Sequence, residues 1–151
     1  MSEQFTKSII VKGDVPTLYA LWANFENFPH FMTNLKSVTE TGEGTSHWKM
    51  VGPVNTTLEW DAETTRMEEG QRIAWRSRED SPFKTSGQVT FTALPQNETE
   101  ITVTLQVVPP HGALGEIVAR LFADPGAQLT KDLRQFKAYA EHQHQENLEL
   151  R

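Results

Sequence analysis

The sequence predicts an α+β fold in which one curved antiparallel sheet of six to seven strands wraps around a long C-terminal helix, with two short helices after the first strand. Segments in the middle of the 151-residue chain alternate apolar and polar residues, which is the period of a strand with one buried face. Apolar residues at helical spacing occur near the two ends of the chain. No repeat, linker or low-complexity stretch divides the chain. We therefore expect one domain over residues 1–151, with a core from about 5–140 and a polar tail over 142–151.

The first strand and both short helices are expected in the first 32 residues. The residues from Phe5 to Lys12 alternate and end in an apolar run, which predicts a strand that Gly13 terminates. Asp14 is a suitable N-cap, and Pro16 fits the first helical turn because it has no backbone donor to lose. A second helical turn is expected over 27–32. Helical spacing places four apolar side chains on one face: Leu18, Leu21, Trp22 and Phe25.

The middle of the chain contains about six consecutive strand patterns separated by turn residues such as Gly, Pro and Asn. In the clearest pattern, Leu58, Trp60 and Ala62 alternate with acidic residues, so the apolar set is expected to face the core. In a later strand the expected inward set is Val89, Phe91 and Ala93. The predicted strands are Lys36–Glu40, His47–Val51, Thr56–Arg66, Arg72–Arg78, Val89–Ala93 and Ile101–Val107.

The last third of the chain has the longest helical pattern, expected from about Ala113 to Glu141. Asp124-Pro125-Gly126 interrupts this pattern, because an interior proline removes a hydrogen bond and clashes with the preceding turn. We expect a break near Phe122–Ala123, with Asp124 capping the second part. The polar residues from His142 onward are expected to fray.

Composition excludes several classes of protein. The net charge of −6 produces a field that repels nucleic acid, so no nucleic-acid partner is expected. The chain has no cysteine, which excludes disulfides, thiolate zinc sites and cysteine nucleophiles. No stretch approaches the roughly 20 apolar residues that span a bilayer, and the N-terminus has no signal-like apolar run. We expect a cytoplasmic protein without an integral membrane segment, and the sequence assigns no oligomeric state.

The titratable residues supply no recognisable catalytic or metal-binding motif. The histidines are scattered and no pair has the spacing of metal ligands, so no metal is expected; they are His30, His47, His111, His142 and His144. Three carboxylates share one strand face and are expected to meet water, opposite arginines of the next strand; they are Glu59, Asp61 and Glu63, facing Arg72, Arg76 or Arg78. No phosphate-binding loop or serine-hydrolase motif occurs, so no cofactor is predicted and catalytic residues stay unassigned.

Large rings and methionines are expected to line a cavity between the sheet and the long helix. Taken singly, each of them is better explained as ordinary core, but together they suit a flat or apolar ligand. The predicted pocket residues are Phe28, Phe31, Met32, Trp48, Met50, Leu58, Trp60, Trp75, Phe91, Leu121, Phe122 and Leu129. The polar residues that could face inward among them are Asn34, Thr56, Thr64, Ser77 and Thr85.

Several segments together resemble the helix-grip fold of the START/Bet v 1-like superfamily, in its polyketide cyclase/dehydrase-like branch. The resemblance covers roughly Phe5 to Ala140. It implies a ligand cavity beneath the C-terminal helix, and the superfamily includes binders of lipids, quinones (the coenzyme Q-binding-like branch) and hormones besides aromatase/cyclases. The segments are 11–22, 25–32, 58–63, 73–77, 87–91 and 112–137, which include Phe-Glu-Asn-Phe-Pro-His-Phe-Met and Gly-Gln-Val-Thr-Phe.

Two functions remain open from the sequence. The first is binding of a hydrophobic small molecule, such as a lipid, a quinone or an aromatic polyketide-like compound, in the cavity. The second is a cyclase/dehydratase that acts on a polyketide-like substrate in the same cavity. The enzyme requires a titratable or hydroxyl group within hydrogen-bond reach of the substrate. Alternation along the strands places no acid or histidine inside, and this favours binding.

Overall fold

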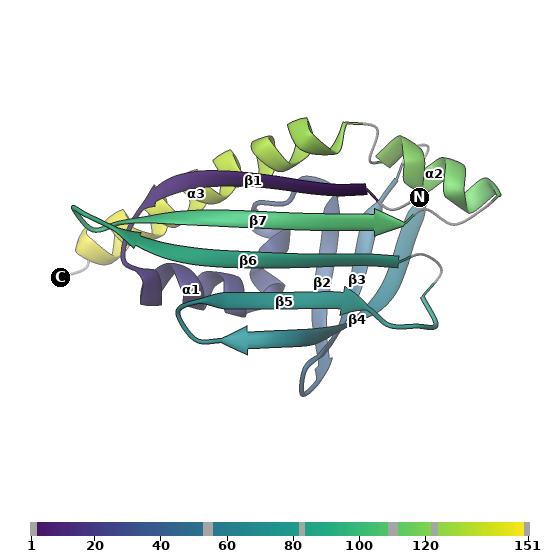
Figure 1. Ribbon diagram of the computed structural model, residues 1–151, viewed down its shortest axis with the longest axis horizontal. Coiled ribbons are helices and arrows are strands. Elements are labelled where there is room, and N and C mark those ends of the chain that lie inside the picture. Colours follow the sequence, from purple (N-terminus) through teal and green to yellow (C-terminus); the bar gives the residue numbers. More distant parts are fainter. Residues whose placement is uncertain (1–2, 53–55, 82–83, 109–111, 122–123, 150–151) are drawn as a thin grey trace.

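The described part of the chain, in a computed structural model, comprises residues 3–52, 56–81, 84–108, 112–121 and 124–149. Seven strands form one antiparallel sheet in the order β1-β7-β6-β5-β4-β3-β2, which confirms the predicted fold class. Figure 1 shows β2 and β3 crossing the direction of β1 and β7, because the sheet curves strongly. The strands are β1 Glu3–Lys12, β2 Leu35–Gly42, β3 Thr45–Val51, β4 Thr57–Glu68, β5 Arg72–Ser77, β6 Lys84–Leu94 and β7 Glu98–Val108.

Two short helices follow β1, as predicted. The first, α1 (Val15–Ala23), begins at Asp14, whose side chain accepts a hydrogen bond from the Thr17 amide at 3.1 Å. The second is a 3-10 helix, η1 (Phe25–His30), which begins two residues earlier than expected. The reason is Asn24, which ends α1 in an extended conformation and accepts a hydrogen bond from the Glu26 amide at 3.2 Å. Phe25 is therefore a buried residue of η1 and does not belong to the apolar face of α1.

The C-terminal helical region is divided where proline predicts a break. Helix α2 runs over Ala113–Leu121 and helix α3 over Pro125–Glu149. Phe122 and Ala123 lie outside the described residues. Asp124 caps α3: its Oδ1 atom accepts a hydrogen bond from the Ala127 amide at 3.2 Å.

The expected fraying from His142 onward is wrong, because α3 continues to Glu149. Glu and Gln are good helix formers and prevail in this polar segment, which contains neither Gly nor Pro. The Lys137–Glu141 ion pair, 2.8 Å long and one turn apart, supports the helix just before it.

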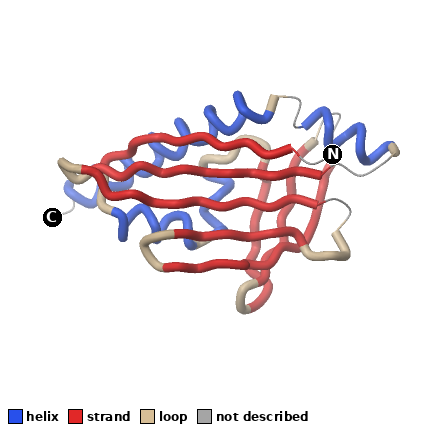
Figure 2. Tube along the Cα trace, in the orientation of Figure 1, coloured by secondary structure: helices blue, strands red, loops and turns tan. Residues whose placement is uncertain are grey.

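Helix α3 lies against the concave side of the sheet, behind the strands in Figure 2, and joins the two edge strands β1 and β2. Along β1, Lys137 Nζ donates to the Ile10 carbonyl at 2.9 Å and Glu141 accepts from the Lys12 amide at 3.1 Å. Near the start of β2, the Thr33 amide donates to Asp132 at 3.2 Å. The helix therefore closes the space that the curved sheet encloses.

Strand alternation decides which side chains enter that space. Leu58, Trp60 and Ala62 on β4 are buried, whereas Glu59 and Asp61 are exposed, as predicted. On β6 the prediction holds for Val89 and Phe91 but is wrong for Ala93, which is exposed. Ala93 is the penultimate residue of β6, at the hairpin to β7, and its methyl group has little apolar surface to bury.

Candidate functional site

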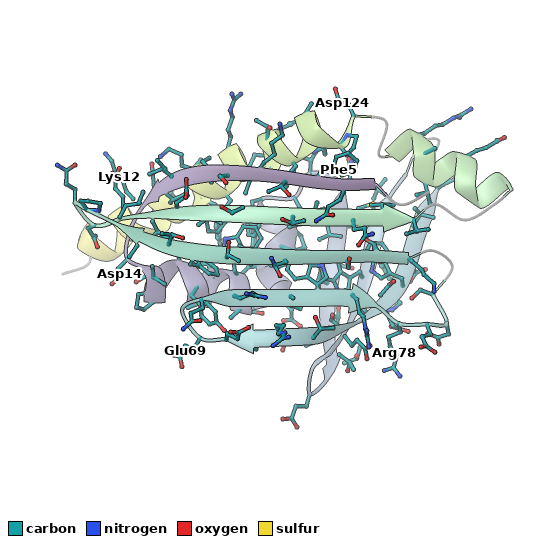
Figure 3. The ribbon with its side chains drawn as sticks, in the orientation of Figure 1. Phe5, Lys12, Asp14, Glu69, Arg78 and Asp124 are labelled. Carbon is teal, nitrogen blue, oxygen red and sulfur yellow. The ribbon has the colours of Figure 1, made fainter. Side chains whose placement is uncertain are left out.

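A cavity of about 90 Å³ lies between the concave face of the sheet and the first turns of α3. Its wall is largely apolar and includes residues from β1, from the loop before β2, from strands β2 to β7 and from α3. Figure 3 shows Asp124 at the start of α3, beside the strand β1 that carries Phe5. The wall residues are Phe5, Met32, Asn34, Leu35, Trp48, Met50, Trp60, Trp75, Thr85, Leu105, Val107, Pro125, Gln128, Leu129 and Asp132.

Three tryptophans from neighbouring strands form the sheet side of this wall. Trp48 on β3 stacks with Trp60 on β4 at a ring-centroid distance of 5.7 Å and with Trp75 on β5 at 6.1 Å. The Trp48 indole N–H donates to the Ser46 hydroxyl at 2.8 Å. These rings are all nearly buried and present wide, flat apolar faces to the cavity.

Gly87 on β6 makes room for one of these rings. A Cβ atom at this position would lie 2.3 Å from Cζ2 of Trp75, a distance that real Cβ atoms essentially never show. The two residues are direct partners in the β5–β6 pairing. The indole of Trp75 therefore lies across the glycine, and any side chain there would displace it.

Six of the twelve predicted pocket residues lie in the cavity wall: Met32, Trp48, Met50, Trp60, Trp75 and Leu129. Four others are buried elsewhere in the core: Phe28, Phe31, Leu58 and Phe91. Phe91 packs edge-on against Tyr19 of α1, with ring centroids 5.5 Å apart. Leu121 belongs to α2, where its side chain is not described, and Phe122 lies outside the described residues.

Phe28 and Phe31 lie outside the cavity wall: Phe28, on η1, packs against two of the wall tryptophans, and Phe31, just after η1, packs against Trp22 and Phe136. Phe28 lies 5.5 Å from Trp48 and 5.4 Å from Trp75, measured between ring centroids. Phe31 lies 4.9 Å from Phe136 of α3. Alternation along a strand reveals which residues face inward, but it does not indicate which inward rings another ring will cover.

The wall contains an acid that the strand pattern did not reveal. Asp132 lies on α3, where its Oδ1 atom accepts hydrogen bonds from the Thr33 amide at 3.2 Å and from Gln128 Nε2 at 3.0 Å. Burial raises the pKa of the Asp132 carboxyl, and these hydrogen bonds oppose that rise. Helical spacing was the available signal: Asp132 follows Leu129 by one turn and shares its face.

Of the five polar residues that were predicted as possible inward-facing groups, some lie in the cavity wall and others do not. Asn34 and Thr85 lie in the wall, whereas Thr56, Thr64 and Ser77 do not. The Thr85 hydroxyl donates to the Gln106 carbonyl at 3.1 Å, so its proton is engaged within the sheet.

The acidic face of β4 meets solvent, as predicted, but its main partner is a histidine of β3. His47 Nδ1 lies 2.8 Å from Asp61 and its Nε2 lies 3.0 Å from Glu59. These two hydrogen bonds raise the pKa of His47 because they stabilise the protonated ring. The predicted arginine contact occurs at Glu63, 2.7 Å from Arg76. Within the described ranges, no group of three or more His, Cys, Asp or Glu residues is arranged to hold a metal ion.

The comparison with known proteins agrees with this architecture. Residues 11–132 match the family described as polyketide cyclase / dehydrase and lipid transport. A protein of Streptomyces lincolnensis, an uncharacterized 17.2 kDa protein from the melC2-rnhH intergenic region, is 30% identical over 141 residues. That alignment covers 93% of this chain and 91% of the relative. In the part of the chain that the structure describes, no helix is long and apolar enough to cross a membrane.

Two solved structures show the same fold. A crystal structure of DR_A0006 from Deinococcus radiodurans has 30% sequence identity and a TM-score of 0.74, covering 90% of this chain and 95% of that one. The Zhui aromatase/cyclase from Streptomyces sp. R1128 has 18% identity and a TM-score of 0.72, covering 93% and 94%. At that identity the second likeness concerns the fold alone. The family match over residues 11–132 shows that the chain belongs to the family described as polyketide cyclase / dehydrase and lipid transport.

Proposed function

We propose that this protein binds a hydrophobic small molecule, such as a lipid, a quinone or an aromatic polyketide-like compound, in the cavity between the sheet and α3. The observation that carries the proposal is the wall itself: three stacked tryptophans and two methionines border empty space between the sheet and α3. Protein interiors are usually filled, so a void bounded by large apolar side chains indicates a place for an apolar guest.

The size of the cavity bears on the kind of guest. Ligand pockets commonly measure about 300–1,000 Å³, and the cavity of about 90 Å³ is smaller than these. A ligand of several rings therefore requires side chains to move. Met32 and Met50 suit that movement, since an unbranched thioether side chain adapts its shape at low cost. We expect the cavity to widen when it is loaded.

A cyclase/dehydratase is the second candidate, and Asp132 is the observation that favours it. Proton transfer during ring closure requires an acid or base in contact with the substrate, and Asp132 places a carboxyl group in the wall. Burial raises the pKa of that carboxyl above its ordinary value, which is the direction expected of a general acid. Incubation with a poly-β-ketone substrate, followed by product analysis, distinguishes the enzyme from the binder.

Native mass spectrometry of the protein purified from its own host tests the binding proposal directly, since a bound lipophile would add its mass. In parallel, the apolar probe N-phenyl-1-naphthylamine is titrated while tryptophan emission is recorded. Three of the four tryptophans lie in the cavity wall, so probe uptake should quench most of the emission. No copurified mass together with no probe uptake would contradict the proposal.

A matched pair of variants links the probe to the cavity. Leu129→Phe replaces an aliphatic side chain of the cavity wall with a larger aromatic one, and should abolish probe uptake while the fold is kept. Leu133→Phe makes the same change one turn later, where the side chain is buried outside the wall. Overpacking there should cost about 1–3 kcal/mol of stability but leave probe uptake in the folded protein. Equal probe binding by Leu129→Phe and the parent would locate the site elsewhere.

A further inference from the structure

Asp132 is held in place through only one of its two carboxyl oxygens. Oδ1 accepts from the Thr33 amide at 3.2 Å and from Gln128 Nε2 at 3.0 Å. The Thr33 hydroxyl also lies 3.1 Å from Oδ1 and 3.1 Å from Gln135 Oε1, so its single proton serves one of them at a time. These contacts come from α3 and from the loop before β2, and they fix the orientation of the carboxyl group.

The second oxygen, Oδ2, has no hydrogen-bond donor among the described residues, although Asp132 lines the cavity. Oδ2 is not one of the buried side-chain atoms that lack a partner, so water reaches it while the cavity is empty; a guest that displaces this water must supply a donor, because a dry, unpaired carboxyl oxygen is costly. Two other polar groups of the wall have other roles: the Thr85 hydroxyl donates within the sheet and the Trp48 N–H donates to Ser46. A bound molecule is thus offered one oriented, unused oxygen.

We infer that Oδ2 of Asp132 anchors a hydroxyl group of the bound molecule, which makes the ligand class hydroxylated: a phenol or an alcohol with an apolar body. This inference rests on the proposed function and names the chemistry of the ligand. A hydroxyl both donates and accepts. It can donate to Oδ2 of the ionised carboxylate, and it can accept the proton that Oδ2 carries in the neutral acid. A ketone oxygen matches only the neutral form.

The side chain of Asn34 is the competing anchor, because it also lies in the wall, next in sequence to Thr33. Its backbone carbonyl accepts from the Val51 amide at 2.9 Å, which holds the residue at the start of β2. Asn34→Leu and Asp132→Leu therefore form a matched pair. Each removes one polar group from the same wall and replaces it with the same apolar side chain.

The test uses p-cresol and p-xylene, which have nearly the same shape and differ by a hydroxyl in place of a methyl group. Dissociation constants for both are measured by calorimetry on the full-length protein and its variants. We expect Asp132→Leu to lower the affinity for p-cresol relative to p-xylene by about tenfold, the value of one hydrogen bond to a carboxyl group. Asn34→Leu should change this affinity ratio by less than about twofold, because on this inference Asn34 makes no hydrogen bond to the hydroxyl group.

Asp132→Asn is the control for a general disruption of the site. Its amide oxygen can retain the Oδ1 contacts, and its amide nitrogen places a donor where Oδ2 stood, so p-xylene binding should persist and the ratio should fall less than in Asp132→Leu. The ¹³C shift of the hydroxyl-bearing carbon of p-cresol reports the hydrogen bond itself. It should differ between the parent and Asp132→Leu, and the Leu variant must still bind p-xylene.

The outcomes separate the two proposals. If the parent binds neither compound, the cavity proposal fails and this inference fails with it. If the parent binds both compounds and Asp132→Leu leaves the affinity ratio and the ¹³C shift unchanged, the hydroxyl anchor alone is overturned. A ratio that falls in Asn34→Leu and not in Asp132→Leu would also overturn it, because the anchor would then be the amide.

Discussion

The close approach of Trp75 to Gly87 leads to a sharp prediction. In Gly87→Ala the new Cβ atom would lie 2.3 Å from Cζ2 and 2.6 Å from Cε2 of Trp75, and 3.0 Å from Cδ2 of Leu105. Carbon atoms prefer separations of about 3.5–4.0 Å. Because the Cβ–Cζ2 separation would be only 2.3 Å, the indole has to move by more than about 1 Å. Overpacking of this kind costs about 1–3 kcal/mol.

The direction of that movement connects stability to binding. Trp75 borders the cavity, so the indole can relieve the clash by moving into the empty space of about 90 Å³. The stability cost should then lie near the low end of the range, about 1 kcal/mol, while uptake of N-phenyl-1-naphthylamine is lost. Urea unfolding measures the first quantity and the probe titration measures the second. Tryptophan emission should also shift, because a reporting ring changes its surroundings.

Gly126→Ala is the matched control. Gly126 lies in the first turn of α3, and the nearest side-chain atom to its added Cβ would be Lys7 Cε at 3.6 Å, an ordinary contact. Alanine in a helix is favoured over glycine by up to about 1 kcal/mol, so this variant should be as stable as the parent or more so and should bind probe normally. If Gly87→Ala behaves like Gly126→Ala in both assays, the proposed ring displacement is refuted.

Three further predictions concern the core, a helix cap and pH. Phe28→Ala should cost about 3–5 kcal/mol in urea unfolding, because Phe28 is completely buried among other rings; Met32→Ala should cost clearly less, since Met32 borders empty space. Asp124→Ala should lower stability by about 1 kcal/mol through loss of the α3 cap, and an unchanged thermal midpoint would contradict this. The raised pKa of His47 implies a stabilisation that is complete below about pH 6.5, the pKa in the unfolded chain, and is lost as pH rises through the higher pKa of the folded protein. The free energy of unfolding of the parent should therefore exceed that of His47→Gln most at acid pH, and the difference should shrink toward alkaline pH.

The fold was predictable because its elements carry local signals. Alternation along β4 and β7, the Asp14 cap and the break before Pro125 each depend on residues within a few positions of one another. Such patterns specify which elements form and which of their faces are buried. The sheet confirms the predicted antiparallel pairing around a C-terminal helix, whereas its strand order, with β1 beside β7, had not been predicted.

The cavity was only partly predictable, because its wall depends on contacts between distant elements. Phe28 and Trp48 are both inward-facing aromatics, yet Phe28 is covered by other rings and Trp48 borders the void. Nothing local distinguishes them. Asp132 was missed for a different reason: the search for an interior acid followed the strands, whereas this acid is on the helix that closes the sheet. Its partner Thr33 lies 99 positions earlier in the chain.

The void persists because its walls are held from behind. An apolar cavity collapses when neighbouring side chains can move inward, and the destabilisation that the cavity causes falls as they fill it. Here the backbone positions of Trp48, Trp60 and Trp75 are set by the pairing of β3, β4 and β5, and Phe28 packs against Trp48 and Trp75 from η1.

On the opposite side, α3 is anchored beyond the cavity, where Phe136 packs against Trp22 at 4.9 Å and Lys137 bonds to β1. Among the α3 side chains that the structure describes, those that border the empty space lie in the first turns, which carry Leu129 and Asp132. The rigid flat rings on one side and the single oriented carboxyl group on the other therefore face each other across the cavity. This arrangement favours a flat apolar molecule with one polar end over a flexible chain, for which the rings offer no matching shape.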